Sequence, residues 1–187
     1  AIESWGDQVE VAVTVHYDIT KTDFMTELGL IDAANPEAVL YVGYYTDGRI
    51  MFRQALTLGL DKYPWFCSEG IYGDALIYQD TTPLTDVAEF LRRCAKGTTP
   101  VAPVGLESAE LFKQKYEDAY GESPAMYCDT AYDATWLAIL SIAHAGVYDG
   151  AEIRDSLETI GPFYLGGSGW KLFDENGDML TQTYQIW

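Results

Sequence analysis

The chain has 187 residues, 48% of them hydrophobic and 14% aromatic, which suffices for one domain or two small lobes with a packed core. Its 29 acidic and 11 basic residues give a formal net charge of -18, which repels phosphate backbones and anionic membrane surfaces. The composition therefore excludes a disordered chain and argues against nucleic acid as a partner.

Residues that could hold a metal are few. The three cysteines (Cys67, Cys94 and Cys128) lack C-x-x-C spacing, and only His16 and His144 could join them, so we interpret the cysteines as free thiols. No apolar run approaches the roughly 18 residues of a membrane-spanning helix. We expect no metal, no cofactor and no direct membrane insertion of this segment.

The first part of the chain predicts alternating strands and helices. Residues 1–6 read as the end of a helix closed by Gly6, and they lack the features of a signal peptide. Valines alternate with other residues over 8–17, which is typical of a strand. There follow a helix at 24–34, a strand at 38–44 that is apolar as if covered on both faces, a helix at 50–60, and a strand at 63–70.

The second part is richer in helices. Residues 72–84 read as a surface loop with a short helical piece, and 86–96 as a helix stopped by Gly97. Two prolines make 98–105 unsuited to a central strand, so we interpret it as a crossing between lobes. Helices are predicted at 108–120, at 129–145 as part of the core, and at 150–160, and an Asn-Gly turn predicts an antiparallel hairpin over 169–187. Successive strand, helix and strand units predict an α/β fold with parallel strands.

Two acidic stretches stand out. Glu69 follows the apolar run 65–67 and is expected at the carboxyl end of a strand, the edge that lines the ligand crevice of open α/β sheets. A solvated loop glutamate is the alternative. Asp174, Asn176 and Asp178 have the spacing that opens a calcium loop, but the later bidentate glutamate is absent, so we predict no calcium site.

A succession of short motifs runs along nearly the whole chain: Tyr17-Asp18, Thr22-Asp23-Phe24, Arg53-Gln54-Ala55, Gly59-Leu60, Ser68-Glu69-Gly70, Phe112, Tyr116, Tyr120-Gly121, Pro124, Ala131-Tyr132-Asp133-Ala134, Phe173-Asp174 and Gly177-Asp178. Their order and spacing resemble the type I periplasmic binding proteins of the leucine/isoleucine/valine-binding family. The resemblance implies doubly wound, mostly parallel sheets in two lobes, here incomplete.

Domain boundaries follow from the same resemblance. Residues 1–104 are expected to form most of the second lobe, 105–165 the returning part of the first lobe, and 166–187 the carboxyl-terminal hairpin and the last crossing. The chain then corresponds to the carboxyl-terminal half of such a protein.

The resemblance also implies roles for single residues. Glu69 matches the carboxylate that pairs with the α-ammonium of a bound amino acid, Tyr44 an aromatic at the border of the same pocket, and Tyr127 an aromatic that closes over the ligand from the other lobe. Thr46 and Ser68 either donate hydrogen bonds to the ligand or cap the adjacent helix and strand end. Tyr132 and Asp133 are expected to support a helix start.

The implied function is that of an extracytoplasmic solute-binding protein of an ABC importer, which binds a branched-chain or other small amino acid and delivers it to a membrane permease. It is expected at the periplasmic or extracellular face of the cell membrane, after removal of a signal peptide. Whether the missing amino-terminal part anchors it to the membrane is left open. The alternative is a ligand-sensing domain of the same fold for an amide, urea or related small solute. An enzyme is not expected, because no nucleophile motif, phosphate loop or metal set is present.

Overall fold

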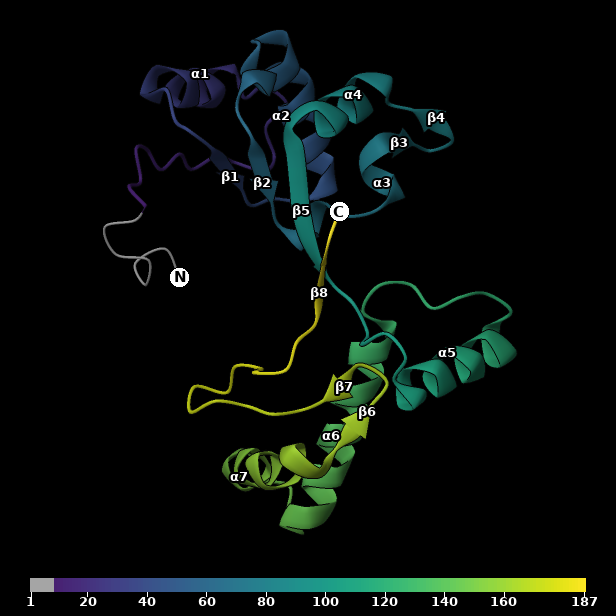
Figure 1. The fold of residues 1–187 in the computed structure, drawn as a ribbon. Helices are drawn as coiled ribbons and strands as arrows, with labels where there is room; N and C mark the ends of the chain where they lie inside the picture. Colours follow the sequence, from purple (N-terminus) through teal and green to yellow (C-terminus); the bar gives the residue numbers. More distant parts are fainter. Residues whose placement is uncertain (1–8) are drawn as a thin grey trace. The chain divides into compact units, whose positions relative to one another are not determined.

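The computed structural model describes residues 9–187 and divides the chain into two compact units (Figure 1). Unit 1 consists of Ala1–Thr99 with Ile186–Trp187, and unit 2 of Pro100–Gln185. The helix end expected at 1–6 lies outside the described residues. The lobe boundaries at 104 and 165 stay predictions.

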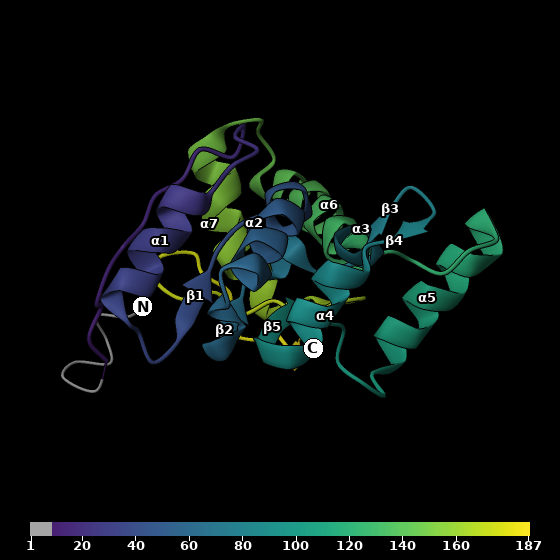
Figure 2. The same cartoon turned by 90° about the horizontal axis from the view of Figure 1, so that it is seen from above.

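Unit 1 alternates helices with short strands. Parallel strands β1, β2 and β5 pair in that order, and β8 adds to the far side of β5; Figure 2 shows the first three in a row. Of the two predicted parallel strand, helix, strand units, the second, formed by β1, α2 and β2, is confirmed. The elements are α1 (Met25–Ala34), β1 (Val39–Tyr41), α2 (Tyr45–Thr57), η2 (Leu60–Lys62), β2 (Trp65–Cys67), η3 (Glu69–Ile71), α3 (Asp74–Ile77), β3 (Tyr78–Gln79), β4 (Thr82–Pro83), α4 (Thr85–Cys94) and β5 (Ala95–Pro100). The last strand of the sheet, β8 (Tyr184–Ile186), enters unit 1 at Ile186.

The core of unit 1 lies on one face of this sheet. Trp65 of β2, Phe52 of α2 and Phe90 of α4 are buried, with the two phenylalanine rings stacked at 5.0 Å. Side chains alternate between faces along a strand, and Leu40 and Phe66 on the opposite face are 62% and 50% exposed. The expectation that the strand at 38–44 is covered on both faces is therefore wrong for the described residues.

Two further predictions for unit 1 are wrong. Residues 9–17 form no strand, because a strand needs a hydrogen-bonding neighbour and none of the described strands pairs with them. Part of the expected crossing at 98–105 belongs to β5, which lies inside the sheet, and Gly97 is a residue of this strand and not a helix stop. Pro100 is the last residue of β5, where its missing N–H interrupts few ladder bonds.

Unit 2 contains helices and short strands. The predicted helices are confirmed within one or two residues as α5 (Glu107–Tyr120), α6 (Cys128–Ala145) and α7 (Gly150–Ile160), followed by η4 (Gly161–Phe163), β6 (Leu165–Gly166) and β7 (Gly169–Trp170). α6 packs along α7. The prediction that α6 belongs to the core holds for Leu137 and Ser141, which are buried, but Trp136, Ile139 and Leu140 are exposed.

The predicted carboxyl-terminal hairpin is correct only around its turn. The Leu180 N–H donates to the Leu172 carbonyl at 2.8 Å, and Phe173 forms an antiparallel bridge with Met179. Beyond the turn the two arms part, because β7 pairs with β6 and β8 pairs with β5. Gly97 and Trp187 exchange two backbone hydrogen bonds, of 3.1 and 3.0 Å, which is the pattern of an antiparallel pair.

Candidate functional site

The candidate site lies at the carboxyl edge of the sheet in unit 1. β1 and β2 are parallel neighbours, so their carboxyl ends meet, and Tyr44 and Glu69 follow these ends. The Ser68 N–H donates to the Tyr41 carbonyl at 3.0 Å, which extends the ladder to this point. A Cβ built at Gly70 would lie 2.5 Å from the Gly43 oxygen and 3.5 Å from Cδ1 of Tyr44. The segments that carry Tyr44 and Glu69 are therefore in direct contact.

Glu69 presents a carboxylate at this edge. It is exposed and opens η3, and among the described residues its side chain makes no hydrogen bond or ion pair. Arg49, the basic residue closest in sequence to Tyr44, donates its guanidinium hydrogens to the carbonyls of Ala75 and Tyr78. The Glu69 carboxylate is thus available to a cation from outside the unit.

The other predicted residues of unit 1 surround Glu69 in different ways. Tyr44 is the N-cap residue of α2, and its ring is exposed. The Thr46 hydroxyl donates to Oδ1 of Asp47 at 3.3 Å, so it already has an acceptor within the helix start. Ser68 is half-buried and is the N-cap residue of η3, without a side-chain capping bond. Binding of a ligand by these side chains stays a prediction.

Sequence reasoning missed a buried carboxylate beneath the same edge. Asp47 in the first turn of α2 is 2% exposed and accepts hydrogen bonds from the hydroxyls of Tyr17, at 2.5 Å, and Tyr41, at 2.7 Å. It also accepts the Tyr44 N–H at 3.3 Å. The available signal was an acidic residue at the third helical position, where its charge suits the helix dipole. Tyr17 is 30 residues away and gives no such signal.

The phenols around Asp47 hold their protons tightly. Burial, followed by the hydrogen bond to Asp47, raises the pKa of Tyr17 to about 12. Burial also raises the pKa of Tyr41 far above its usual value, and the bonds to Tyr17 and Asp47 act in the same direction. Both hydroxyls therefore stay protonated well above neutral pH and can donate to the carboxylate.

Tyr127 belongs to unit 2, where it precedes α6. Its backbone adopts a left-handed conformation with φ of 72°, which is uncommon for a residue with a side chain. Such backbone strain often accompanies a functional constraint, and Tyr127 is 42% exposed. Its role as a wall of the ligand pocket stays a prediction.

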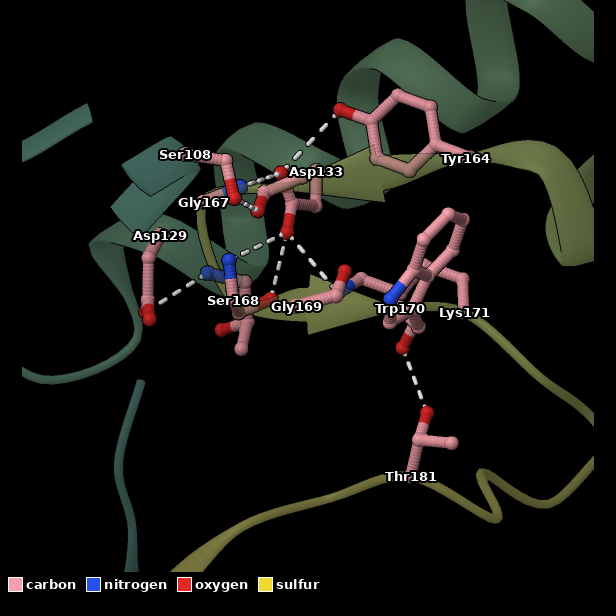
Figure 3. A network of polar contacts seen from close by, with 12 residues as sticks. Ser108, Asp129, Asp133, Tyr164, Gly167, Ser168, Gly169, Trp170, Lys171 and Thr181 are labelled. Carbon is pink, nitrogen blue, oxygen red and sulfur yellow. Dashed lines mark hydrogen bonds and ion pairs between the residues drawn. The ribbon is translucent and has the colours of Figure 1, made fainter. Parts of the chain in front are cut away.

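Unit 2 also holds a buried ion pair (Figure 3). The Asp133 carboxylate is fully buried, lies 3.0 Å from Nζ of Lys171, and accepts the backbone N–H groups of Gly167 and Ser168, each at 2.8 Å. The hydroxyls of Ser168 and Tyr164 donate to it as well, at 2.6 and 3.2 Å. These bonds attach the β6–β7 hairpin to α6, so Asp133 supports the hairpin and not the helix start.

The environment of Asp133 favours its ionised form. Burial by itself raises the pKa of this carboxyl, but the bonds from Ser168, Lys171 and Gly167 outweigh burial and lower the pKa below its usual value. The nearby carboxylate has the opposite effect on Tyr164, whose pKa is raised by burial and by the charge of Asp133. The network is a structural element of the hairpin.

The described residues contain no group of three side chains suited to a metal ion. Asp174, part of the calcium-like spacing, instead accepts the backbone N–H groups of Asn176 and Asp178 at 2.9 and 2.8 Å and so closes its own turn. All three cysteines are free thiols. Among the helices at 9–187, none is long and apolar enough to cross a bilayer.

Comparison with known proteins identifies solved structures of the same fold. The leucine-binding protein LivK of Thermotoga maritima is 26% identical, with 92% of this chain and 47% of that chain covered at a TM-score of 0.71. A type 1 periplasmic binding protein of Bordetella pertussis is 17% identical, with 98% and 51% covered and a TM-score of 0.71. LivJ of Streptococcus pneumoniae, solved with isoleucine, is 20% identical, with 91% and 50% covered and a TM-score of 0.55.

No protein-family model matches the chain, and no curated protein does. The chain spans about half the length of the solved structures it resembles. Its fold is that of a partial type I periplasmic binding protein, as the motifs in its sequence predict.

Proposed function

We propose that this chain is the carboxyl-terminal half of an extracytoplasmic solute-binding protein that binds a branched-chain or other small amino acid for an ABC importer. The observation that carries the proposal is the unpartnered, exposed Glu69 at the carboxyl edge of a parallel sheet, with the backbone of Tyr44 beside it. Similarity to structures described as binding leucine and isoleucine supports it.

The chemistry of the edge suits an ammonium ligand. A carboxylate that is withdrawn from water when a cleft closes makes a charge-assisted hydrogen bond worth about 1.5 to 3 kcal/mol. An aromatic wall such as Tyr44 takes up an apolar side chain, and the family resemblance assigns the same role to Tyr127. Binding proceeds by closure of two lobes, without a reaction step.

The partner that follows from this function is the permease of the importer. Delivery of a solute to a permease takes place at the periplasmic or extracellular face of the membrane. Unit 1 contributes Glu69 and Tyr44, and the groups that hold the α-carboxylate come from the half of the fold that this chain does not span. We therefore expect weak or no amino-acid binding by the 187 residues alone.

Calorimetry with a panel of amino acids on the complete protein tests the proposal. Glu69→Gln is expected to weaken binding at least about tenfold, which corresponds to about 1.4 kcal/mol. Glu37→Gln is the matched control, because Glu37 is also exposed but precedes β1 at the opposite edge of the sheet. It is expected to leave the affinity unchanged.

A ligand pair sharpens the test. Leucine and its α-hydroxy analogue differ at the ammonium group, so the unmodified protein should prefer leucine and Glu69→Gln should lose most of this preference. Equal affinities of both proteins for every amino acid would reject the role of Glu69. Binding of neutral amides in place of amino acids would support the ligand-sensing alternative.

A further inference from the structure

Asp47 is a buried carboxyl side chain that the proposed contacts to ligand do not use. It is 2% exposed and makes no ion pair with any residue in the described range 9–187. An unpaired buried carboxylate is costly and persists only where several donors compensate it. We therefore ask which parts of the chain the donors to Asp47 connect.

The donors come from three separate segments of unit 1. Tyr17 belongs to the segment before α1, Tyr41 is the last residue of β1, and the Tyr44 N–H lies at the start of α2. Gly43 lies between Tyr41 and Tyr44 in the sequence. The hydroxyls of Tyr17 and Tyr41 occupy the space that a Cβ of Gly43 would need. Asp47 thus joins the chain before α1, the end of β1 and the backbone of Tyr44.

The same backbone segment carries the contact with η3. Gly43 and Tyr44 pack directly against Gly70, which follows Glu69 in the sequence. Any displacement of residues 43–44 changes the position of the Tyr44 ring relative to the Glu69 carboxylate. Asp47 is therefore bonded to the segment that carries Tyr44, and this segment contacts the segment that carries Glu69.

We propose that Asp47 is a positioning residue that fixes Tyr44 beside Glu69 before the ligand arrives. This inference rests on the proposed function, and it adds a residue that does not itself contact the ligand. Fixing a site in its binding geometry raises affinity because less conformational entropy is lost on binding. A carboxylate suits the task, because it accepts three or more hydrogen bonds where an amide oxygen accepts fewer.

A first test needs no ligand and uses the 187-residue chain. In Asp47→Asn, the Tyr44 amide should exchange with deuterium faster than in the unmodified protein, while amides of β2 keep their exchange rates. NMR titration of 13C-labelled tyrosine should show the pKa of Tyr17 falling from about 12 toward the usual range.

Asp32→Asn is the matched control. Asp32 also accepts a tyrosine hydroxyl, from Tyr63 at 3.2 Å, but it lies near the end of α1, away from the candidate site. This variant should leave the exchange of the Tyr44 amide and the titration of Tyr17 unchanged. If Asp47→Asn fails to fold, Tyr17→Phe serves instead, since it removes one donor and keeps the buried carboxylate.

The second test measures binding in the complete protein. Asp47→Asn should weaken the binding of leucine and of its α-hydroxy analogue by the same factor, about tenfold. The reason is that the substitution misplaces the Tyr44 ring and leaves the Glu69 carboxylate in place. Glu69→Gln should weaken the binding of leucine alone. A loss in Asp47→Asn that is confined to leucine would mean that Asp47 acts through its charge, and would overturn the positioning role.

The outcomes separate the two proposals. If the unmodified protein binds no amino acid, the proposed function fails whatever Asp47 does. If it binds leucine and Asp47→Asn binds it equally well, only the positioning role is rejected. Unchanged exchange of the Tyr44 amide in both Asp47→Asn and Tyr17→Phe would reject that role as well.

Discussion

The Gly43 carbonyl oxygen faces the Cα of Gly70 so closely that a Cβ at Gly70 would lie 2.5 Å from it. The contact joins the segment after β1 to the segment after β2 and sets the spacing of the two predicted ligand groups, Tyr44 and Glu69. Backbone atoms form this contact, so rotation of a side chain cannot relieve an added methyl group.

We predict that Gly70→Ala destabilises unit 1 and displaces η3. Overpacking of this kind typically costs about 1 to 3 kcal/mol. Gly29→Ala is the control, because Gly29 lies within α1 and a Cβ there would meet nothing within 4 Å. It should stabilise the protein by about 0.5 to 1 kcal/mol. Urea denaturation of both variants measures the difference, and equal stabilities would contradict the close contact.

Glu69→Gln should leave the stability of the 187-residue chain unchanged within about 0.5 kcal/mol, the usual range for surface substitutions. The reason is that its side chain is exposed and makes no bond within residues 9–187. Urea denaturation checks this. A clear loss of stability would show that the carboxylate has a structural role, and the loss of binding could then no longer be assigned to the ligand.

The ion pair of Asp133 and Lys171 should be strongly coupled. Removing one partner leaves the other charge buried, so Asp133→Asn and Lys171→Met should each cost about 3 to 5 kcal/mol, and the double variant should cost less than their sum. The control is Asp155→Asn, since the Asp155–Arg154 pair is exposed and should contribute little to stability. Amide exchange of β6 and β7 reports the effect, and additive losses would contradict the coupling.

The same carboxylate predicts a pH dependence. The pKa of Asp133 is lowered in the folded protein, so its contribution to stability is complete above the unfolded-state pKa, which is about 3.9, and decreases as pH falls through the folded-state pKa. The difference in unfolding free energy between the unmodified protein and Asp133→Asn should be constant from about pH 5 to 8 and shrink below about pH 4. A difference that grows in acid would contradict the sign of the shift.

Gly97→Ala should loosen the pairing of β5 with β8. The Trp187 indole occupies the position that a Cβ of Gly97 would take, so an alanine must displace the ring. The backbone N–H of Trp187, which donates to the Gly97 carbonyl, should then exchange faster with deuterium. Gly150→Ala is the control, because a Cβ there meets nothing within 4 Å. Unchanged exchange in Gly97→Ala would mean that the ring has room to move.

Local signals made much of the fold predictable. α1 ends at Asn35, as the Asn-Pro pair predicts, and α5 ends at Gly121, and both of these residues adopt a left-handed conformation. The position of Glu69 after a parallel strand was predictable, because the apolar run before it and Gly70 after it mark the strand in the sequence. Each of these features depends on neighbours in the sequence.

Contacts between distant residues were not predictable. The valines before Tyr17 alternate as in a strand, yet alternation does not supply a partner strand. β5 and β8 pair although Gly97 looks like a helix stop and the end of the chain looks like one arm of a hairpin. Asp47 accepts a hydrogen bond from Tyr17, 30 residues away, and Asp133 accepts bonds from residues 31 to 35 positions away, which no local pattern reveals.

The exchange of hydrogen bonds between Gly97 and Trp187 has a consequence for biosynthesis. β5 leaves the ribosome long before β8, because the whole of unit 2 is translated between them. Until β8 emerges, one side of β5 exposes unpaired backbone groups, which are a template for pairing with other chains. Nascent chains that stall inside unit 2 should therefore depend on chaperones more than completed ones do.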